Sequence, residues 1–248
     1  MKKIFVIIIL LSSIIKIQSF GQQSSFAEFG KPQDSTNFEI KLNPDFFLLG
    51  TLSDYGGRFY SIDREKQIDK YYPYEISLMH YLTKFIFNNY QIKVDTVSLI
   101  GNKNSKMFSK IMANKLHNFY DEKGNLNNNI FDSEDKKYSF ITGAFVRYGA
   151  VIQDNFYKIH IYNSSKDKVI LALLKDLYCN KIAYKSLNGI PNSDIFYFEA
   201  TPRLIKYFNT VKSENKSIQH ALYKGHESTE HFKVEQNKLI ESLKNTFK

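Results

Sequence analysis

The stretch that most constrains the fold is an alternation of apolar and polar residues on both sides of Asp154-Asn155. Both residues of this dipeptide tolerate positive φ, so it suits a tight turn between two strands. With Gln153 opposite Phe156, the register of the hairpin follows. Because strand side chains alternate, an apolar core face is predicted for Val146, Tyr148, Tyr157, Ile159 and Ile161. The opposite, polar face then carries Arg147, Lys158, His160 and Tyr162.

A helix is predicted directly after this hairpin. Ser164 or Ser165 suits its N-cap, and Ser164 with Asp167 has the spacing of a capping box. The apolar face of the helix follows at three- and four-residue steps, with Ile170, Leu173, Leu174 and Leu177. The strand end therefore delivers Arg147, His160 and Tyr162 near a helix N-terminus, whose free N–H groups favour anions.

The rest of the chain alternates between predicted strands and helices. Thr201-Pro202 is a clear helix start, and Phe46 to Leu52 is an apolar run of strand length. Further strands are predicted at 37–42, 91–100, around 182–184 and at 194–199, and further helices at 74–89 and 103–120. We find no internal repeat in the sequence. The pattern predicts an α+β fold: a mixed sheet of about five to seven strands with packed helices and a helical C-terminal appendage. A three-layer α/β sandwich fits the same order of elements.

Residues 1–21 have the pattern of a signal peptide, with Lys2 and Lys3 before an apolar stretch that ends near Ser19-Phe20-Gly21. That stretch is shorter than the roughly 20 residues that span a bilayer, so cleavage is predicted and no transmembrane segment is expected afterwards. No cysteine lies near the junction, which argues against a lipoprotein. Residues 22–36 are predicted to be a disordered leader. Residues 37–248 are predicted to form a single globular domain, helical from about 213, in a secreted or periplasmic protein.

The formal charge of +9 falls by three to +6 if Lys2, Lys3 and Lys16 leave with the signal peptide. The remaining lysines are spread along the chain, and this spread, together with export, argues against nucleic acid as a partner. The partners that we expect are an anionic small molecule or an envelope polymer. The polar C-terminal helices offer a surface for a protein partner.

Three other patterns carry no chemistry in this interpretation. Cys179 is the only cysteine, and we expect a free thiol at a fraying helix end. Ser165 to Lys168 has the Ser-x-x-Lys spacing of penicillin-recognising acyl transferases, but the partner motifs are missing. His226 to His231 fails the His-Glu-x-x-His pattern, because Glu230 takes the place of the second histidine. We therefore expect no metal and no cofactor.

The candidate site joins a polar strand face to the residues that follow the apolar run. An arginine fork and helix N–H groups would bind an anion, and a histidine would transfer a proton near neutral pH. The candidate ligand-binding residues are Asp54, Tyr55, Arg58, Arg147, His160, Tyr162, Ser164 and Ser165. The preferred hypothesis is a binding or interaction protein of the bacterial cell envelope. The alternative is a hydrolase of an anionic envelope substrate, so the sequence leaves open whether the protein is an enzyme.

Overall fold

The computed structural model describes residues 39–60, 62–98, 104–224, 238 and 241, all of which belong to the compact unit formed by residues 37–248. The predicted signal peptide at 1–21, the predicted leader at 22–36 and the His226 to His231 pattern lie outside the described residues. These predictions, and the export that follows from the first, stay predictions.

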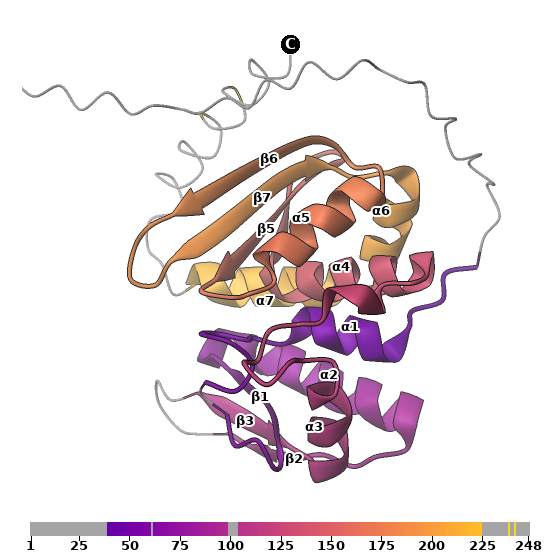
Figure 1. Cartoon of the computed structure of the whole chain (residues 1–248). Helices are drawn as coiled ribbons and strands as arrows, with labels where there is room; N and C mark the ends of the chain where they lie inside the picture. The colour runs from indigo at the N-terminus through magenta and orange to yellow at the C-terminus, as the bar shows by residue number, and fades with distance from the viewer. Residues whose placement is uncertain (1–38, 61, 99–103, 225–237, 239–240, 242–248) are drawn as a thin grey trace, which may run out of the picture. The chain divides into compact units, whose positions relative to one another are not determined.

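The predicted α+β class is confirmed (Figure 1). The described strands belong to two antiparallel sheets, with the orders β1-β3-β2 and β4-β5-β7-β6, rather than to one mixed sheet or a three-layer sandwich. The strands are β1 (Gln67–Tyr71), β2 (Asp95–Val97), β3 (Ser105–Phe108), β4 (Gly149–Gln153), β5 (Phe156–Tyr162), β6 (Asn180–Leu187) and β7 (Ser193–Glu199). The α-helices are α1 (Pro44–Thr51), α2 (Ile76–Tyr90), α3 (Lys110–His117), α4 (Glu134–Tyr148), α5 (Asp167–Asp176), α6 (Pro202–Asn209) and α7 (Lys212–Lys224), and two 3₁₀ turns cover Pro73–Glu75 and Asn128–Ile130.

The apolar run from Phe46 to Leu52 is a helix for almost its whole length, so the prediction of a buried strand is wrong. The Asn43 side chain accepts a hydrogen bond from the Phe46 amide at 3.3 Å, and Pro44 takes the first helical position. Every residue of α1 from Phe46 to Thr51 is buried. A helix that is enclosed on all sides has no polar face, so its sequence has the same appearance as a fully buried strand.

The same reason explains the second error, the prediction of a strand through Val146, Arg147 and Tyr148. These residues form the last turn of α4, whose positions from Tyr138 to Arg147 are all buried. The helix begins after Ser133, and Glu134 and Asp135 place acidic side chains at its positive end. Only the second strand of the predicted hairpin keeps its assigned length, and β4 begins at Gly149 instead.

Helices α1 and α4 pack directly against each other at two glycines. A Cβ added to Gly50 would stand 2.1 Å from the Phe140 carbonyl oxygen, and one added to Gly143 would stand 2.1 Å from the Phe47 carbonyl oxygen. This reciprocal contact reveals an internal repeat that we did not recognise from sequence alone. The repeat has the form Phe-x-x-Gly-x-x-x-x-Tyr-Gly, and its two copies are Phe47, Gly50, Tyr55, Gly56 and Phe140, Gly143, Tyr148, Gly149.

The turn at Asp154-Asn155 is confirmed, since Gln153 lies opposite Phe156. Tyr157, Ile159 and Ile161 are buried, as predicted, and they lie on the face that also carries Phe196 and Phe198 of β7. The apolar face of α5 is confirmed as well. The start of α6 is the predicted one, because Thr201 Oγ1 accepts a hydrogen bond from the Leu204 amide at 3.3 Å.

Three other predicted elements differ from the structure. Residues 39–42 contain no strand, and the strand predicted at 91–100 is reduced to the short β2. The helix predicted at 103–120 is the strand β3 followed by the shorter α3, because Ser109 caps the helix through a 3.4 Å bond from the Met112 amide. Helix α7 begins where the helical C-terminal part was expected.

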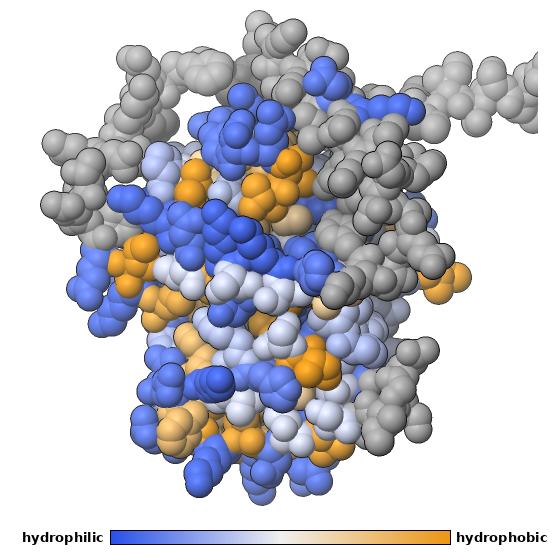
Figure 2. Space-filling view, turned by 180° about the vertical axis from the view of Figure 1, so that it is seen from behind, coloured by the Kyte–Doolittle hydropathy of each residue, from blue (hydrophilic) through white to orange (hydrophobic). Residues whose placement is uncertain are grey.

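Hydrophilic side chains cover most of the described surface in Figure 2, and hydrophobic residues lie among them in small separate groups. Within the described residues, no helix combines the length and the apolar character that crossing a membrane requires.

Candidate functional site

The structure separates the eight predicted site residues into two groups. Asp54, Arg58 and Arg147 are buried, with exposed fractions of 2%, 1% and 4%. The others lie at or near the surface: Tyr55, His160, Tyr162, Ser164 and Ser165. The single anion site that we predicted therefore does not exist in that form, because its arginines lie inside the protein.

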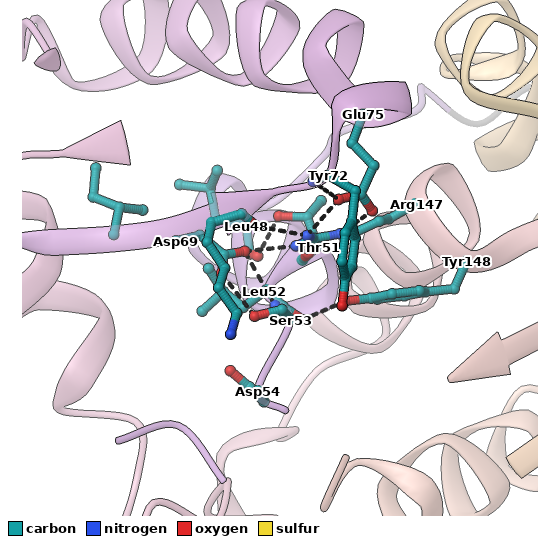
Figure 3. Close-up of polar contacts among 12 residues, drawn as sticks. Leu48, Thr51, Leu52, Ser53, Asp54, Asp69, Tyr72, Glu75, Arg147 and Tyr148 are labelled. Carbon is teal, nitrogen blue, oxygen red and sulfur yellow. Dashed lines mark hydrogen bonds and ion pairs between the residues drawn. The ribbon is translucent and has the colours of Figure 1, made fainter. Parts of the chain in front are cut away.

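Arg147 uses all five of its N–H donors within the core (Figure 3). Its Nε and Nη2 atoms donate to the two carboxylate oxygens of Glu75 at 2.8 and 2.9 Å. Its Nη1 atom donates to Asp69 at 2.6 Å and to the Thr51 carbonyl at 2.7 Å, and Nη2 also reaches the Lys70 carbonyl at 2.8 Å. No donor remains for a bound anion, so Arg147 is a structural residue.

Asp54 is the centre of a second buried group. Its Oδ2 atom accepts a hydrogen bond from the Tyr120 hydroxyl at 2.6 Å and lies 3.1 Å from the Lys166 ammonium. Lys166 also donates to the carbonyls of Leu49 and Leu52 at 2.6 and 2.8 Å. Burial lowers the pKa of Lys166, and Asp54 opposes that shift. The sequence pattern did not single out Lys166, because a lysine beside a predicted helix start is ordinarily solvated.

Arg58 lies beside these residues. Its Nη2 atom donates to the Ile68 carbonyl at 2.5 Å and approaches His117 Nε2 at 3.3 Å, while Nη1 stands 3.7 Å from Asp54. Burial, followed by the charge of Arg58, lowers the pKa of His117 to about 4. His117 is thus neutral at pH 7 and accepts from the guanidinium. The His117 ring is half-buried.

The buried residues around Arg147 and those around Asp54 form one cluster at the C-terminal end of α1. With three cations and three carboxylates, the cluster has no net formal charge. Arg147 donates to the Thr51 carbonyl and Lys166 to the Leu49 carbonyl in the last turn of this helix, which is the favourable end of the helix dipole for a cation. Among the described residues, no three His, Cys, Asp or Glu side chains are arranged to hold a metal ion. The members of the cluster are Asp54, Arg58, Asp69, Glu75, Arg147 and Lys166.

The hydrolase hypothesis is wrong on this geometry. It required Arg147 and His160 on one strand face, but Arg147 belongs to α4 and is enclosed by carboxylates. Burial, followed by the charge of Lys158, lowers the pKa of His160 to about 4. His160 is therefore neutral at pH 7 and unsuited to the proton transfer near neutral pH that we expected.

The capping prediction at Ser164 and Ser165 is also wrong. Helix α5 begins at Asp167 with Lys166 as its N-cap, and no side chain caps it. Ser164 Oγ instead accepts a hydrogen bond from the Lys166 amide at 3.3 Å. Ser165 Oγ is buried and has no hydrogen-bond partner among the described residues.

The outward face of the four-stranded sheet carries the surface group. In the observed register, Lys158 lies opposite Tyr197 and His160 lies opposite Ile195, so these side chains share one face. Lys185 of β6 pairs with Ile195 and belongs to the same face. Tyr162 is 44% exposed, and its hydroxyl lies 3.1 Å from His160 Nδ1. The predicted polar face is thus confirmed for the three residues that belong to β5, which are Lys158, His160 and Tyr162.

The three-stranded sheet continues this surface. Lys70 and Lys106 lie opposite each other in the register of β1 and β3, outside the buried positions Asp69 and Met107. The Lys70 ammonium stands 5.8 Å from the centre of the Tyr55 ring. Tyr55 forms an isolated bridge with Ser164, two residues beyond the end of β5. We call this surface the basic–aromatic strip and define it as Tyr55, Lys70, Lys106, Lys158, His160 and Tyr162.

No protein-family model matches the chain, and no curated protein matches it. Solved structures do match. Mesophilic variants of the homing endonuclease I-DmoI share 17% identity at a TM-score of 0.45, over 68% of this chain and 95% of theirs. I-DmoI in complex with DNA and Ca shares 18% identity at a TM-score of 0.43, over 71% of this chain and 97% of that chain. A variant with its target DNA and Mn shares 17% identity at a TM-score of 0.45, over 70% and 97%. No functional residue is carried over from these structures.

Our expectation of an envelope-binding protein finds no support among the matched structures, which are those of a homing endonuclease, two of them in complex with DNA, and we withdraw it. The envelope description of its role and the envelope polymer as partner are withdrawn with it, whereas the export predicted from residues 1–21 stays a prediction. We withdraw the exclusion of nucleic acid as well, since two of the matched structures hold DNA. That exclusion assumed that lysines spread along the sequence stay apart in space, whereas strand pairing brings Lys70 beside Lys106 and places Lys158 on one face with Lys185.

Cys179 is another corrected prediction, since the residue is 8% exposed instead of lying at a frayed end. Burial raises the pKa of its thiol to about 12. Only the thiolate reacts with alkylating reagents, so the native protein is expected to resist iodoacetamide at pH 8. Mass spectrometry after labelling, with and without urea, checks this result. Equal labelling of native and unfolded protein would contradict it.

Proposed function

We propose that the protein binds nucleic acid through the basic–aromatic strip. The observation that carries the proposal is the convergence of Lys70, Lys106 and Lys158 on the outward faces of the two sheets, with aromatic rings between them. A phosphate backbone is a line of negative charges, and lysines on a surface bind it by releasing its counterions. The chain carries a formal charge of +9, or +6 without the three lysines of the predicted signal peptide, and a net positive charge favours the same class of ligand.

The aromatic side chains distinguish this surface from one that binds any polyanion. Tyr55 lies next to Lys70, and Tyr162 lies two positions from His160 and four from Lys158 on the same face of β5. Interleaved cations and rings are typical of surfaces that bind both the phosphates and the bases of a nucleic acid. Acidic residues lie at the margins of the two faces, where Asp95 pairs with Phe108 and Glu199 pairs with Phe156.

The proposed activity is binding. The carboxylates of the buried cluster are each engaged by a cation of the chain itself, as Asp69 is by Arg147 and Asp54 by Lys166. A carboxylate held by an internal cation at hydrogen-bonding distance does not serve as a ligand for an added ion.

The test is fluorescence anisotropy with labelled oligonucleotides of about 20 nucleotides at several salt concentrations. The double variant Lys70→Ala/Lys106→Ala is expected to weaken binding and to reduce the slope of log K against log salt by about two. The matched control is Lys168→Ala/Lys175→Ala, which removes the same charge from α5, on the opposite side of the four-stranded sheet. Equal losses in the two double variants, or no binding at low salt, would rule out the proposed interface.

A further inference from the structure

Tyrosines gather where the basic–aromatic strip crosses from one sheet to the other. Tyr72 and Tyr74 stack on each other with ring centres 5.6 Å apart and planes within 6°. Tyr72 is 43% exposed and Tyr162 is 44% exposed. Tyr162 lies close enough to Tyr74 to contribute to its raised pKa, although burial and Glu75 contribute more. Exposed aromatic rings therefore lie on both sides of this crossing, with Tyr72 next to the three-stranded sheet and Tyr162 at the end of β5.

Exposed rings of this kind do little for the binding of a duplex. The bases of a duplex are already stacked on their neighbours, and their faces are closed to a protein ring unless the helix is opened. An unpaired base has both faces available, and stacking on a protein ring contributes about 1 to 3 kcal/mol per base. The parallel pair of Tyr72 and Tyr74 is a two-layer stack that a third ring can extend on the exposed side of Tyr72.

The positions of the charges agree with such a ligand. The lysines flank the tyrosines on both sides, with Lys70 and Lys106 on the three-stranded sheet and Lys158 on β5. A single strand is flexible enough to place its phosphates on these lysines while its bases turn toward the rings. His160 is neutral at pH 7, so its ring, 4.3 Å from that of Tyr162, adds aromatic surface rather than charge.

We infer that the strip takes single-stranded nucleic acid, with Tyr72, Tyr74 and Tyr162 as the platform for unpaired bases. This inference rests on the proposed function and narrows it to one class of nucleic acid. The recognition chemistry, phosphates with unpaired bases, is shared by single-stranded DNA and RNA.

The test compares three ligands of the same sequence by anisotropy: single-stranded DNA, single-stranded RNA and the DNA duplex. The wild-type protein is expected to bind at least one single strand about tenfold more tightly than the duplex. Tyr72→Ala and Tyr162→Ala are each expected to weaken single-strand binding about tenfold and to leave duplex binding nearly unchanged. Tyr162→Phe keeps the aromatic plane and is expected to retain single-strand binding.

Tyr184→Ala is the matched control. Tyr184 is 45% exposed, close to the value for Tyr162, but it pairs with Phe196 and so lies on the other face of the sheet. Tyr162→Leu keeps the apolar bulk without the ring, and it serves if the alanine variant is too unstable by circular dichroism. Tighter duplex binding, or equal losses for Tyr162→Leu and Tyr184→Ala, would overturn the single-strand inference and leave the proposed function standing. If the wild-type protein binds none of the three ligands, the proposed function itself is wrong.

Discussion

Arg147→Met is expected to lower the free energy of unfolding by about 3 to 5 kcal/mol, which is a large part of the stability of an ordinary domain. The substitution leaves Asp69 and Glu75 buried without the guanidinium that binds both of them. It also leaves the Thr51 and Lys70 carbonyls without that donor. Removing one partner of a buried ion pair is far more damaging than removing the whole pair, because an uncompensated charge remains. Urea denaturation followed by circular dichroism measures the loss.

Arg203→Met is the matched control. Arg203 also pairs with two carboxylates, Glu134 and Asp135, but its side chain is 31% exposed and those of its partners are more exposed still. Exposed ion pairs are screened by water, so this variant is expected to lose no more than about 1 kcal/mol. The triple variant Arg147→Met/Asp69→Asn/Glu75→Gln removes all the charges together and is expected to recover part of the loss. A loss for Arg147→Met no larger than that for Arg203→Met would contradict the structural role.

The cluster also determines how the stability of the protein changes at acid pH. Burial acts to raise the pKa of Asp69, but Arg147, Arg58 and the hydrogen bonds from its neighbours outweigh it, and the pKa lies below its ordinary value. A carboxyl with a lowered pKa in the folded state stabilises the protein above its unfolded pKa of about 4 and loses that contribution as the pH falls further. The wild-type protein is therefore expected to lose stability below about pH 4.

Local patterns were sufficient to predict the parts of the fold that depend on neighbouring residues. The register of β5 followed from the Asp154-Asn155 turn, and the start of α6 followed from Thr201 and Pro202. Both signals act over a few residues, through a turn conformation or a cap, and the surrounding structure does not change them.

Features that depend on distant residues were not predicted. Helix α1 from Phe46 and helix α4 from Tyr138 are enclosed by the rest of the core, so these stretches show no exposed polar face and resemble strands. Arg147 was predicted to bind a ligand because nothing near it in sequence shows that Asp69 and Glu75 neutralise it. Lys70 and Lys106 were treated as isolated charges because only the pairing of β1 with β3 brings them together. Each of these errors arose because the feature depends on contacts between residues that are far apart in the sequence, and a local pattern carries no information about such contacts.

The contact between α1 and α4 predicts that a Gly→Ala substitution destabilises the protein, whereas the same substitution in an open helix stabilises it. In an open helix, Gly→Ala stabilises by about 1 kcal/mol, because glycine has more backbone freedom to lose on folding. Gly143→Ala is expected to do the opposite and to destabilise by about 3 kcal/mol or more, since its Cβ would stand 2.1 Å from the Phe47 carbonyl oxygen. The obstacle is backbone, so a change of rotamer cannot relieve it, and the two helices have to move apart.

Gly189→Ala is the control, because the residue is exposed and its added Cβ would meet only the Pro191 carbonyl oxygen at 3.4 Å. Gly50→Ala is expected to be as damaging as Gly143→Ala, since the contact is reciprocal. Once one substitution has separated the helices, the second meets an interface that is already open, so the double variant is expected to lose less than the sum of the two. Urea denaturation of the wild type, the three single variants and the double variant measures the loss of stability and the departure from additivity. Stabilisation by Gly143→Ala, or strict additivity with Gly50→Ala, would show that the helices do not meet at these glycines.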